Sequence, residues 1–254
     1  MSGAARHAGL LRAAFLAGVA LLLEGLCLAG VIDRITMQAP HRIALDLVRL
    51  VAAGSLNSAI LRTLANALAA FVLATGIGVA TALVLHRMRA VREVLDPLFA
   101  AYYAVPVFAF YPLLIILFGL GNMPEILIGF MLAVVAVIVT VLNGLDRVPA
   151  VLLKVARVNR LGAVATARLV TVPYVGPYVL AAARLAVAYA LIGVVGAEFI
   201  MSPSGMGYEI SYAYMNFDNA TMYPLILLIV VVSVALNSVL GRWETALMRR
   251  RGLA

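Results

Sequence analysis

Six long apolar stretches dominate this sequence and restrict what it can fold into. They cover approximately residues 10–31, 57–86, 97–120, 125–145, 176–200 and 222–243. A helix needs about 20 residues to cross a hydrocarbon core of about 30 Å, and each stretch reaches that length. Backbone groups in lipid must bond to one another, which in runs of this length favours helices over the short strands of a barrel. We therefore expect an all-α membrane protein with about six transmembrane helices in a single transmembrane domain, residues 1–254.

The composition argues against the soluble classes and against catalysis. Hydrophobic residues make up 65% of the chain, compared with about 45–50% in an ordinary soluble domain. The single cysteine, Cys27, excludes a disulfide framework and a cysteine-based metal site, and three scattered histidines form no metal-binding pattern. The chain has no P-loop, HExxH or GxSxG motif. We expect a protein that is not an enzyme, has no metal or cofactor and does not hydrolyse ATP by itself.

The basic residues predict the orientation in the membrane. Fourteen of the nineteen, from Arg6 to Arg251, fall in segments on the same side of the membrane as the N-terminus. Arg34, Arg42 and Arg49 fall on the opposite side. Cytoplasmic loops carry the excess of Lys and Arg, so both termini are expected in the cytoplasm. This placement between apolar runs also argues against a nucleic-acid partner, which the net charge of +8 alone would permit.

Three segments separate the apolar stretches. Residues 32–56 contain an amphipathic part expected along the outer membrane interface. Residues 146–175 form the longest cytoplasmic loop, and residues 201–221 form an outer loop rich in Gly, Ser, Tyr and Asn. The first apolar stretch is too long for a secretory signal and lacks a cleavage site, so we expect it to remain as a helix.

Ionisable side chains within the spans are candidates for function, because each costs at least about 2.5–3.5 kcal/mol at mid-membrane. Glu198 in the fifth span is either part of a substrate path or gate, or a structural hydrogen-bonding group near the interface. Glu24 is expected to be structural, either protonated or paired with a neighbouring helix. Arg62 either attracts an anion or extends to the lipid headgroups.

Two prolines interrupt the third span. Pro106 and Pro112 each lack a backbone donor, so a kink or local unwinding is expected. Aromatic side chains surround them, and these either line a pathway or gate, or pack against other helices. The candidates are Tyr103, Phe108, Phe110 and Tyr111.

Small residues recur in the fifth span at spacings of three and four. They are Ala182, Ala186, Ala190, Gly193 and Ala197. This spacing places them on one face, where they allow the backbone of a neighbouring helix to approach closely.

The cytoplasmic loop resembles the motif of type I ABC importer permeases, which reads E-A-A, three residues, G, nine residues, I-x-L-P. The matching positions are Lys154, Val155 and Ala156 for E-A-A, Arg160 for the glycine, and Val170, Val172 and Pro173 for I-x-L-P. Lysine replaces the usual glutamate and arginine the glycine, with Gly162 two places later. The resemblance implies a short coupling helix that docks in a groove of a separate ATP-binding subunit, with Gly162 and Ala163 also at the contact.

The resemblance extends from about Pro40 to the C-terminus. Residues 96–128 and 190–200 are similar to the third and fifth spans of the nitrate, sulfonate and taurine branch. That branch implies a bacterial inner-membrane importer with two ATPases, a second permease copy or homologue, and a periplasmic substrate-binding protein. Its substrates are small organic or inorganic anions, or pyrimidine vitamin precursors.

An ATPase-independent secondary transporter or membrane scaffold is the alternative. Inverted repeats, or acid–base pairs at mid-membrane in corresponding halves, would favour it. The sequence shows neither pattern.

Overall fold

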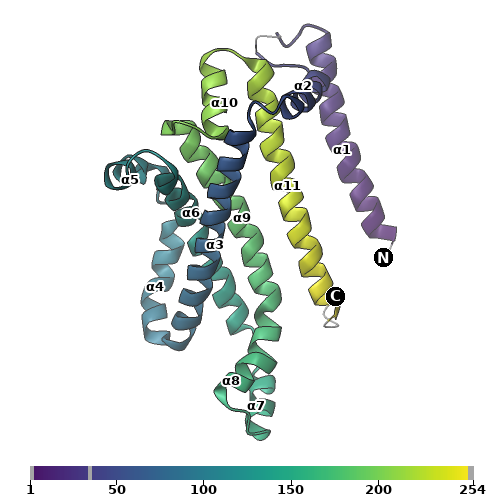
Figure 1. Ribbon diagram of the computed structural model, residues 1–254. Helices are drawn as coiled ribbons and strands as arrows, with labels where there is room; N and C mark the ends of the chain where they lie inside the picture. Colours follow the sequence, from purple (N-terminus) through teal and green to yellow (C-terminus); the bar gives the residue numbers. More distant parts are fainter. Residues whose placement is uncertain (1–2, 34–35, 251–254) are drawn as a thin grey trace. The chain divides into compact units, whose positions relative to one another are not determined.

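A computed structural model describes residues 3–33 and 36–250, all of whose regular elements are helical (Figure 1). Arg34 and Arg251 lie outside the described residues. In chain order the elements are α1 (Gly3–Leu28), α2 (Pro40–Ala53), α3 (Asn57–Arg87), α4 (Arg89–Tyr102), a 3₁₀ turn (Val107–Phe110), α5 (Tyr111–Phe118), α6 (Asn122–Asp146), α7 (Ala150–Val158), α8 (Ala163–Thr166), a π-helical turn (Ala167–Thr171), α9 (Val172–Met201), α10 (Met206–Met215) and α11 (Asn219–Arg250).

The chain divides into two compact units. The first comprises Met1–Ser58 and Glu209–Val231, and the second comprises Ala59–Tyr208 and Val232–Ala254. In the first unit, α2 begins with Pro40 at its first position, where a missing backbone donor costs nothing. The Glu24 carboxylate of α1 lies 2.5 Å from Nδ1 of His41 and accepts the His41 backbone N–H at 3.1 Å. Glu24 is therefore paired with a neighbouring helix, as the sequence predicted.

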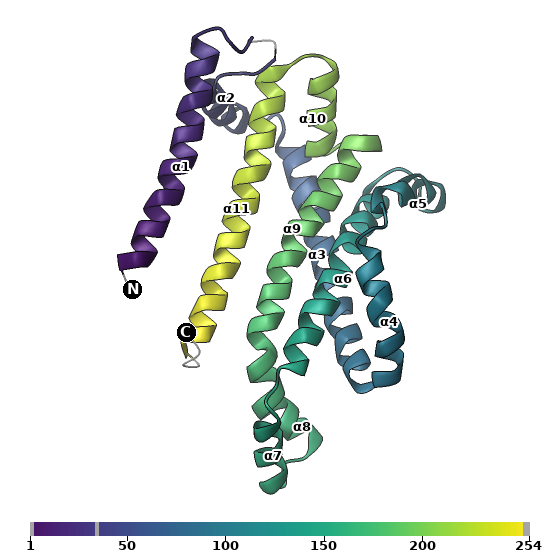
Figure 2. The same ribbon diagram turned by 180° about the vertical axis from the view of Figure 1, so that it is seen from behind.

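The second unit is built around α6 and α9, which lie side by side (Figures 1 and 2). All five small residues predicted to share one face of the fifth span are buried. The closest approach is at Gly193, where an added Cβ would lie 2.5 Å from the Cα of Gly129 on α6. The prediction of close helix packing is confirmed, because only glycine at this crossing leaves room for the facing backbone.

Four helical segments are long and apolar enough to span a membrane. These are α3, α6, the continuous helix Ala163–Met201, and Asn219–Ala246 of α11. Within the described residues, the apolar part of α1 is shorter, Ala14–Leu28. The structure thus has four such helices among the described residues, or five if the bent pair of α4 and Val107–Phe118 is one span. The count of six and the orientation of the termini stay predictions.

The third predicted span, about 97–120, is not a single straight helix. It consists of α4 followed by Val107–Phe118, and the two parts are bent by 93°. The break falls where Pro106 restricts the conformation of Val105 and removes a backbone donor, so that α4 ends at Tyr102. The interruption expected at the prolines is confirmed.

Candidate functional site

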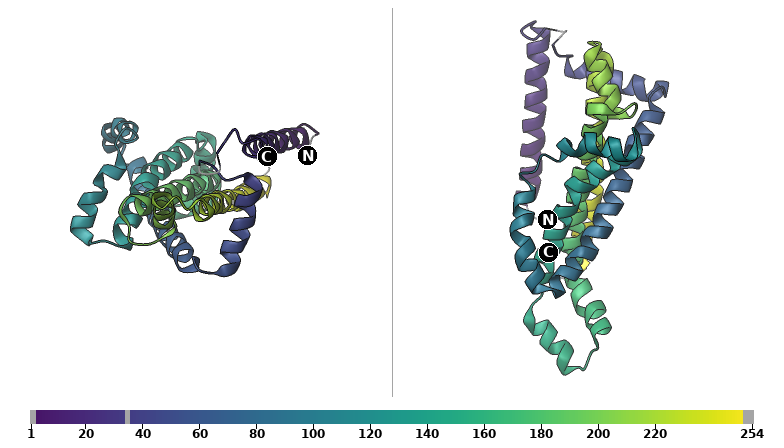
Figure 3. Two further views of the ribbon diagram at one scale, coloured as in Figure 1. Left: turned by 90° about the horizontal axis from the view of Figure 1, so that it is seen from above. Right: turned by 90° about the vertical axis from the view of Figure 1, so that its left-hand side faces the viewer.

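The predicted coupling segment forms a short helix and a tight turn that lead into a long helix. α7 begins after Pro149 and ends at Val158, and α8 begins directly after Gly162. Figure 3 shows this segment extending beyond the ends of α6 and α9. From Ala163 the helix continues through α8, the π-helical turn and α9 to Met201, a length of 39 residues. A displacement of the turn therefore has a continuous helical connection to the opposite end of α9.

The turn after α7 is closed by a Schellman motif. Leu161 N–H donates to the Ala156 carbonyl at 3.0 Å, and Arg160 N–H donates to the Arg157 carbonyl at 3.0 Å. Arg160 has φ of +53°, the left-handed conformation that glycine adopts most readily. The position at which arginine stands in place of the motif's glycine is thus a position whose backbone favours glycine.

Replacing Arg160 by glycine is expected to stabilise the protein by about 0.5–1 kcal/mol. The change relieves about 1–2 kcal/mol of left-handed strain, partly offset by the greater freedom of glycine in the unfolded chain. Arg160→Ala is the control, because it removes the same charge and keeps the strain. Unfolding midpoints in detergent measure both variants. Equal midpoints for the two variants would contradict the expectation.

The structure places the predicted coupling residues on two parts of this segment. Lys154 and Val155 are exposed on α7, whereas Ala156 is buried. Gly162 caps α8 and an added Cβ there would meet no atom within 4 Å. Pro173 stands at the second position of α9, directly after the π-helical turn. Whether these residues contact an ATPase stays a prediction.

The four aromatic candidates around the break have different environments. Tyr111 is fully buried. Phe108 packs against α9 so closely that a Cβ added at Gly196 would lie 2.6 Å from its ring. Tyr103 and Phe110 are exposed, with 57% and 39% of their surface accessible. Phe108 is partly buried, so these two are the most exposed of the four. The role of the group as a gate or pathway stays a prediction.

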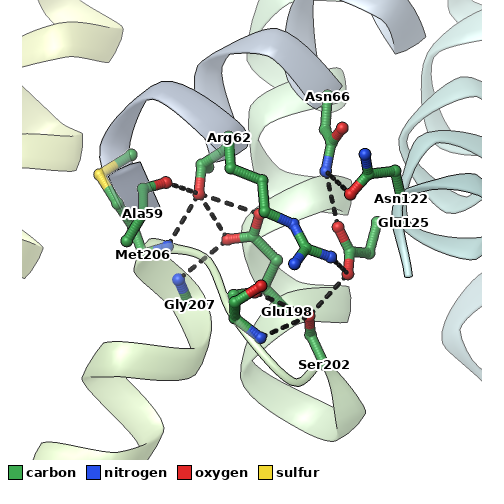
Figure 4. A network of polar contacts seen from close by, with 11 residues as sticks. Ala59, Arg62, Asn66, Asn122, Glu125, Glu198, Ser202, Met206 and Gly207 are labelled. Carbon is green, nitrogen blue, oxygen red and sulfur yellow. Dashed lines mark hydrogen bonds and ion pairs between the residues drawn. The ribbon is translucent and has the colours of Figure 1, made fainter. Parts of the chain in front are cut away.

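Glu198 lies in a buried polar junction between α3, α9 and the start of α10 (Figure 4). Its carboxylate accepts the Gly207 N–H at 3.0 Å and lies 2.7 Å from the Thr63 hydroxyl. That hydroxyl also accepts the Met206 N–H at 2.8 Å. Glu198 is 1% exposed, so this conformation favours the structural role over direct contact with a solute.

Two glycines allow the chain to close over Glu198. A Cβ added at Gly205, which has φ of +112°, would lie 2.5 Å from both carboxylate oxygens. A Cβ added at Gly207 would lie 2.7 Å from the Glu198 Cβ. The GMG sequence after the fifth span is therefore required by the close approach of this backbone to the carboxylate.

Glu125 of α6 forms the second half of the junction. Its carboxylate accepts hydrogen bonds from Asn66 at 2.7 Å and Ser202 at 2.6 Å, and pairs with Arg62 at 3.1 Å. Glu125 has no exposed surface, and these hydrogen bonds compensate its carboxylate for the water that it loses on burial. Arg62 is thus held by a carboxylate within its own chain and does not extend to headgroups.

Sequence reasoning missed Glu125, Thr63, Asn66 and Ser202. The usable signal was Glu125, a carboxylate at the edge of an apolar stretch, which satisfies the same cost argument as Glu198. Its partners Arg62 and Asn66 lie four residues apart on α3, a spacing that places them on one helix face. Nothing in the order of the sequence indicates that this face meets Glu125, about 60 residues later.

Comparisons with known proteins agree on one family. The family model for binding-protein-dependent transport system inner membrane components matches residues 73–252. The putative aliphatic sulfonates transport permease protein SsuC of Bacillus subtilis is 28% identical over 96% of this chain and 87% of that protein. The nitrate import permease protein NrtB of Synechococcus elongatus is 29% identical over 65% of this chain and 59% of that protein.

A solved structure shares the fold. A chain of the MetNI methionine ABC transporter, in an inward-facing conformation, matches 76% of this chain and 95% of its own length. The TM-score is 0.66 and the sequence identity is 17%. At this low sequence identity, the likeness establishes the shared fold alone.

Proposed function

This chain belongs to the family of binding-protein-dependent transport system inner membrane components and is a permease subunit of an ABC importer, and on that premise we propose how it works. A separate ATP-binding subunit docks on the turn between α7 and α8. Closure of two such subunits on ATP moves this turn, and the motion passes along the continuous helix from Ala163 to Met201. The permease itself supplies the path and no ATPase site.

The α7–α8 segment is the observation that carries this proposal. Its turn is fixed by the two Schellman hydrogen bonds. A displacement of α7 therefore also displaces the start of α8. Exposed residues on α7, such as Val155 and Val158, provide apolar surface that the single chain leaves uncovered. A fixed turn with an uncovered apolar side suits a docking element for another protein.

The proposed assembly contains two permeases, two ATPases and a periplasmic substrate-binding protein in a bacterial inner membrane. The second permease is another copy of this chain or a homologue. The names of two relatives support an anion such as a sulfonate or nitrate as the substrate. The resemblance of the sequence to the wider branch adds a pyrimidine vitamin precursor as the other candidate.

Native mass spectrometry of the chain, purified gently from its own host, tests the assembly. We expect two permease copies with two ATPase copies, or one copy with a homologous permease and two ATPases. Lys154 and Arg160, which replace the glutamate and glycine of the motif, would then belong to both halves of a homodimer in the first case. In the second case they would belong to one half of an asymmetric pair. A chain that emerges alone, under conditions that preserve other ABC complexes, would overturn the proposal.

A further inference from the structure

Helix α4 has three distinct faces, and one of them holds it against α6. Leu95 and Phe99 on this face pack against the hydrophobic core of the second unit. Tyr102 donates from its hydroxyl to the Met131 carbonyl of α6 at 2.9 Å. The spacing of these three residues, four and three, is that of a single helix face. This face fixes the rotation of α4 and hence the directions of the other two.

The other two faces of α4 are exposed and chemically opposite. One carries Asp96, Ala100 and Tyr103, and the other carries Val91, Val94 and Leu98. At about 100° per residue, Tyr103 and Val94 point in opposite directions from the helix axis. Both are well exposed, Tyr103 at 57% and Val94 at 69%. The apolar face suits lipid, whereas a face with a carboxylate and a phenol does not.

A pocket of about 480 Å³ lies beside the polar face, between α4 and α6. Arg92, Asp96 and Tyr103 of α4 contribute to its lining, and Asn143 contributes from α6. Phe99 adds an aromatic wall. Charged and amide groups on a helix that borders lipid are placed against protein or water, because lipid cannot solvate them.

We propose that the polar face of α4, together with Asn143 of α6, lines a water-filled section of the solute path, and that this section favours uncharged or cationic solutes over free anions. The inference rests on the proposed permease function and narrows its substrate class toward the pyrimidine-type solutes. It also gives Tyr103 a place along the path, whereas Phe108 and Tyr111 are packed within the chain.

The charge preference follows from the ion pairs around Arg92. Among the described residues, Arg92 is the only basic one that lines the pocket, and its guanidinium is held by two aspartates. Asp146 binds it at 2.6 and 2.7 Å, and Asp96 lies 3.4 Å from its Nε. His86 contacts Asp146 from α3 at 3.3 Å. Arg92 with its two aspartates has a net charge of −1, so the pocket offers an incoming anion no free cation.

Cysteine labelling in the assembled importer tests the position of the path. Cys27→Ser removes the only native thiol, and single cysteines are then placed at Tyr103, Asn143, Val94 and Leu98. The complex with its ATPase and binding protein is reconstituted in lipid and treated with charged methanethiosulfonate reagents, and labelling rates are read by mass. Tyr103→Cys and Asn143→Cys are expected to label at least about tenfold faster than Val94→Cys and Leu98→Cys, because only a hydrated thiol ionises to the reactive thiolate.

The matched faces make the outcome decisive. Equal rates at Tyr103→Cys and Val94→Cys in an assembled complex would overturn the inference and leave the permease function intact. Failure of every variant and of the Cys27→Ser parent to assemble with an ATPase would instead overturn the proposed function, and the path with it. Asn143→Cys provides an independent position if Tyr103→Cys alone fails to fold.

The sign of the reagent charge tests the substrate class. Rates at Tyr103→Cys for a cationic and an anionic reagent are each divided by the rate of that reagent with free cysteine. A cation-to-anion ratio of one or above is expected, since the pocket carries no unpaired cation. A ratio below one would contradict the preference against anions.

Discussion

Glu125→Ala is expected to lower the free energy of unfolding by about 3–5 kcal/mol, the usual cost of leaving one member of a buried ion pair without its partner. The substitution removes the carboxylate that pairs with Arg62 and accepts hydrogen bonds from Asn66 and Ser202. Three donors, two on α3 and one at the end of α9, then lose their acceptor inside the protein. Reversible denaturation in mixed micelles measures the change.

Two further variants separate charge from shape. Glu125→Gln keeps the size of the side chain but cannot neutralise Arg62, so it is expected to be nearly as destabilising as alanine. Arg49→Ala removes an exposed i,i+3 pair with Asp46 and is expected to cost less than about 0.5 kcal/mol. A loss below about 1 kcal/mol for Glu125→Ala would show that the junction does not hold α3 to α6, since an unpaired buried donor alone costs about 1–3 kcal/mol.

Gly162→Trp is expected to reduce ATP-driven uptake at least about tenfold, the effect of losing about 1.4 kcal/mol of binding energy at the ATPase contact. The backbone at Gly162 is extended, with φ of −65° and ψ of 169°, which any residue adopts. A Cβ added there meets nothing within 4 Å, so the bulky side chain is accommodated within the permease itself. The damage should therefore appear only where another subunit covers this turn.

Matched measurements keep the result specific to coupling. Uptake, ATP hydrolysis and the unfolding midpoint are measured for the wild type, Gly162→Trp and Gly76→Trp. Gly76 is also open around its Cβ position but lies on α3, away from the α7–α8 turn. If Gly162→Trp loses uptake but continues to hydrolyse ATP and keeps its unfolding midpoint, ATP hydrolysis is uncoupled from transport. Normal uptake by Gly162→Trp would show that this turn is not the docking element.

Features that depend on residues close together in the sequence were predictable. Apolar length identified the long spans, and the spacing of small residues identified the face of α9 that approaches α6 at Gly193. Pro106 predicted an interruption because its effect on the backbone is local. The loop motif located the segment that the structure resolves into α7, a tight turn and α8.

Features that depend on tertiary approach were not predictable. The packing of Phe108 on Gly196 beside the 93° bend is a contact across nearly 90 residues of chain. The Arg62–Glu125 pair depends on the crossing of α3 and α6. The left-handed conformation of Arg160 is one that its residue type disfavours, so the residue itself gives no sign of it.

The central claim is that this chain is a passive path driven by a separate ATPase, and uptake into proteoliposomes tests it most directly. Vesicles hold the permease with or without its ATPase, and uptake of labelled sulfonate, nitrate and pyrimidine solutes presented by the binding protein is followed. The account predicts uptake of one solute only when the ATPase and ATP are both present, and none with a proton gradient alone. Uptake by the permease without the ATPase, driven by that gradient, would contradict it and establish a secondary transporter.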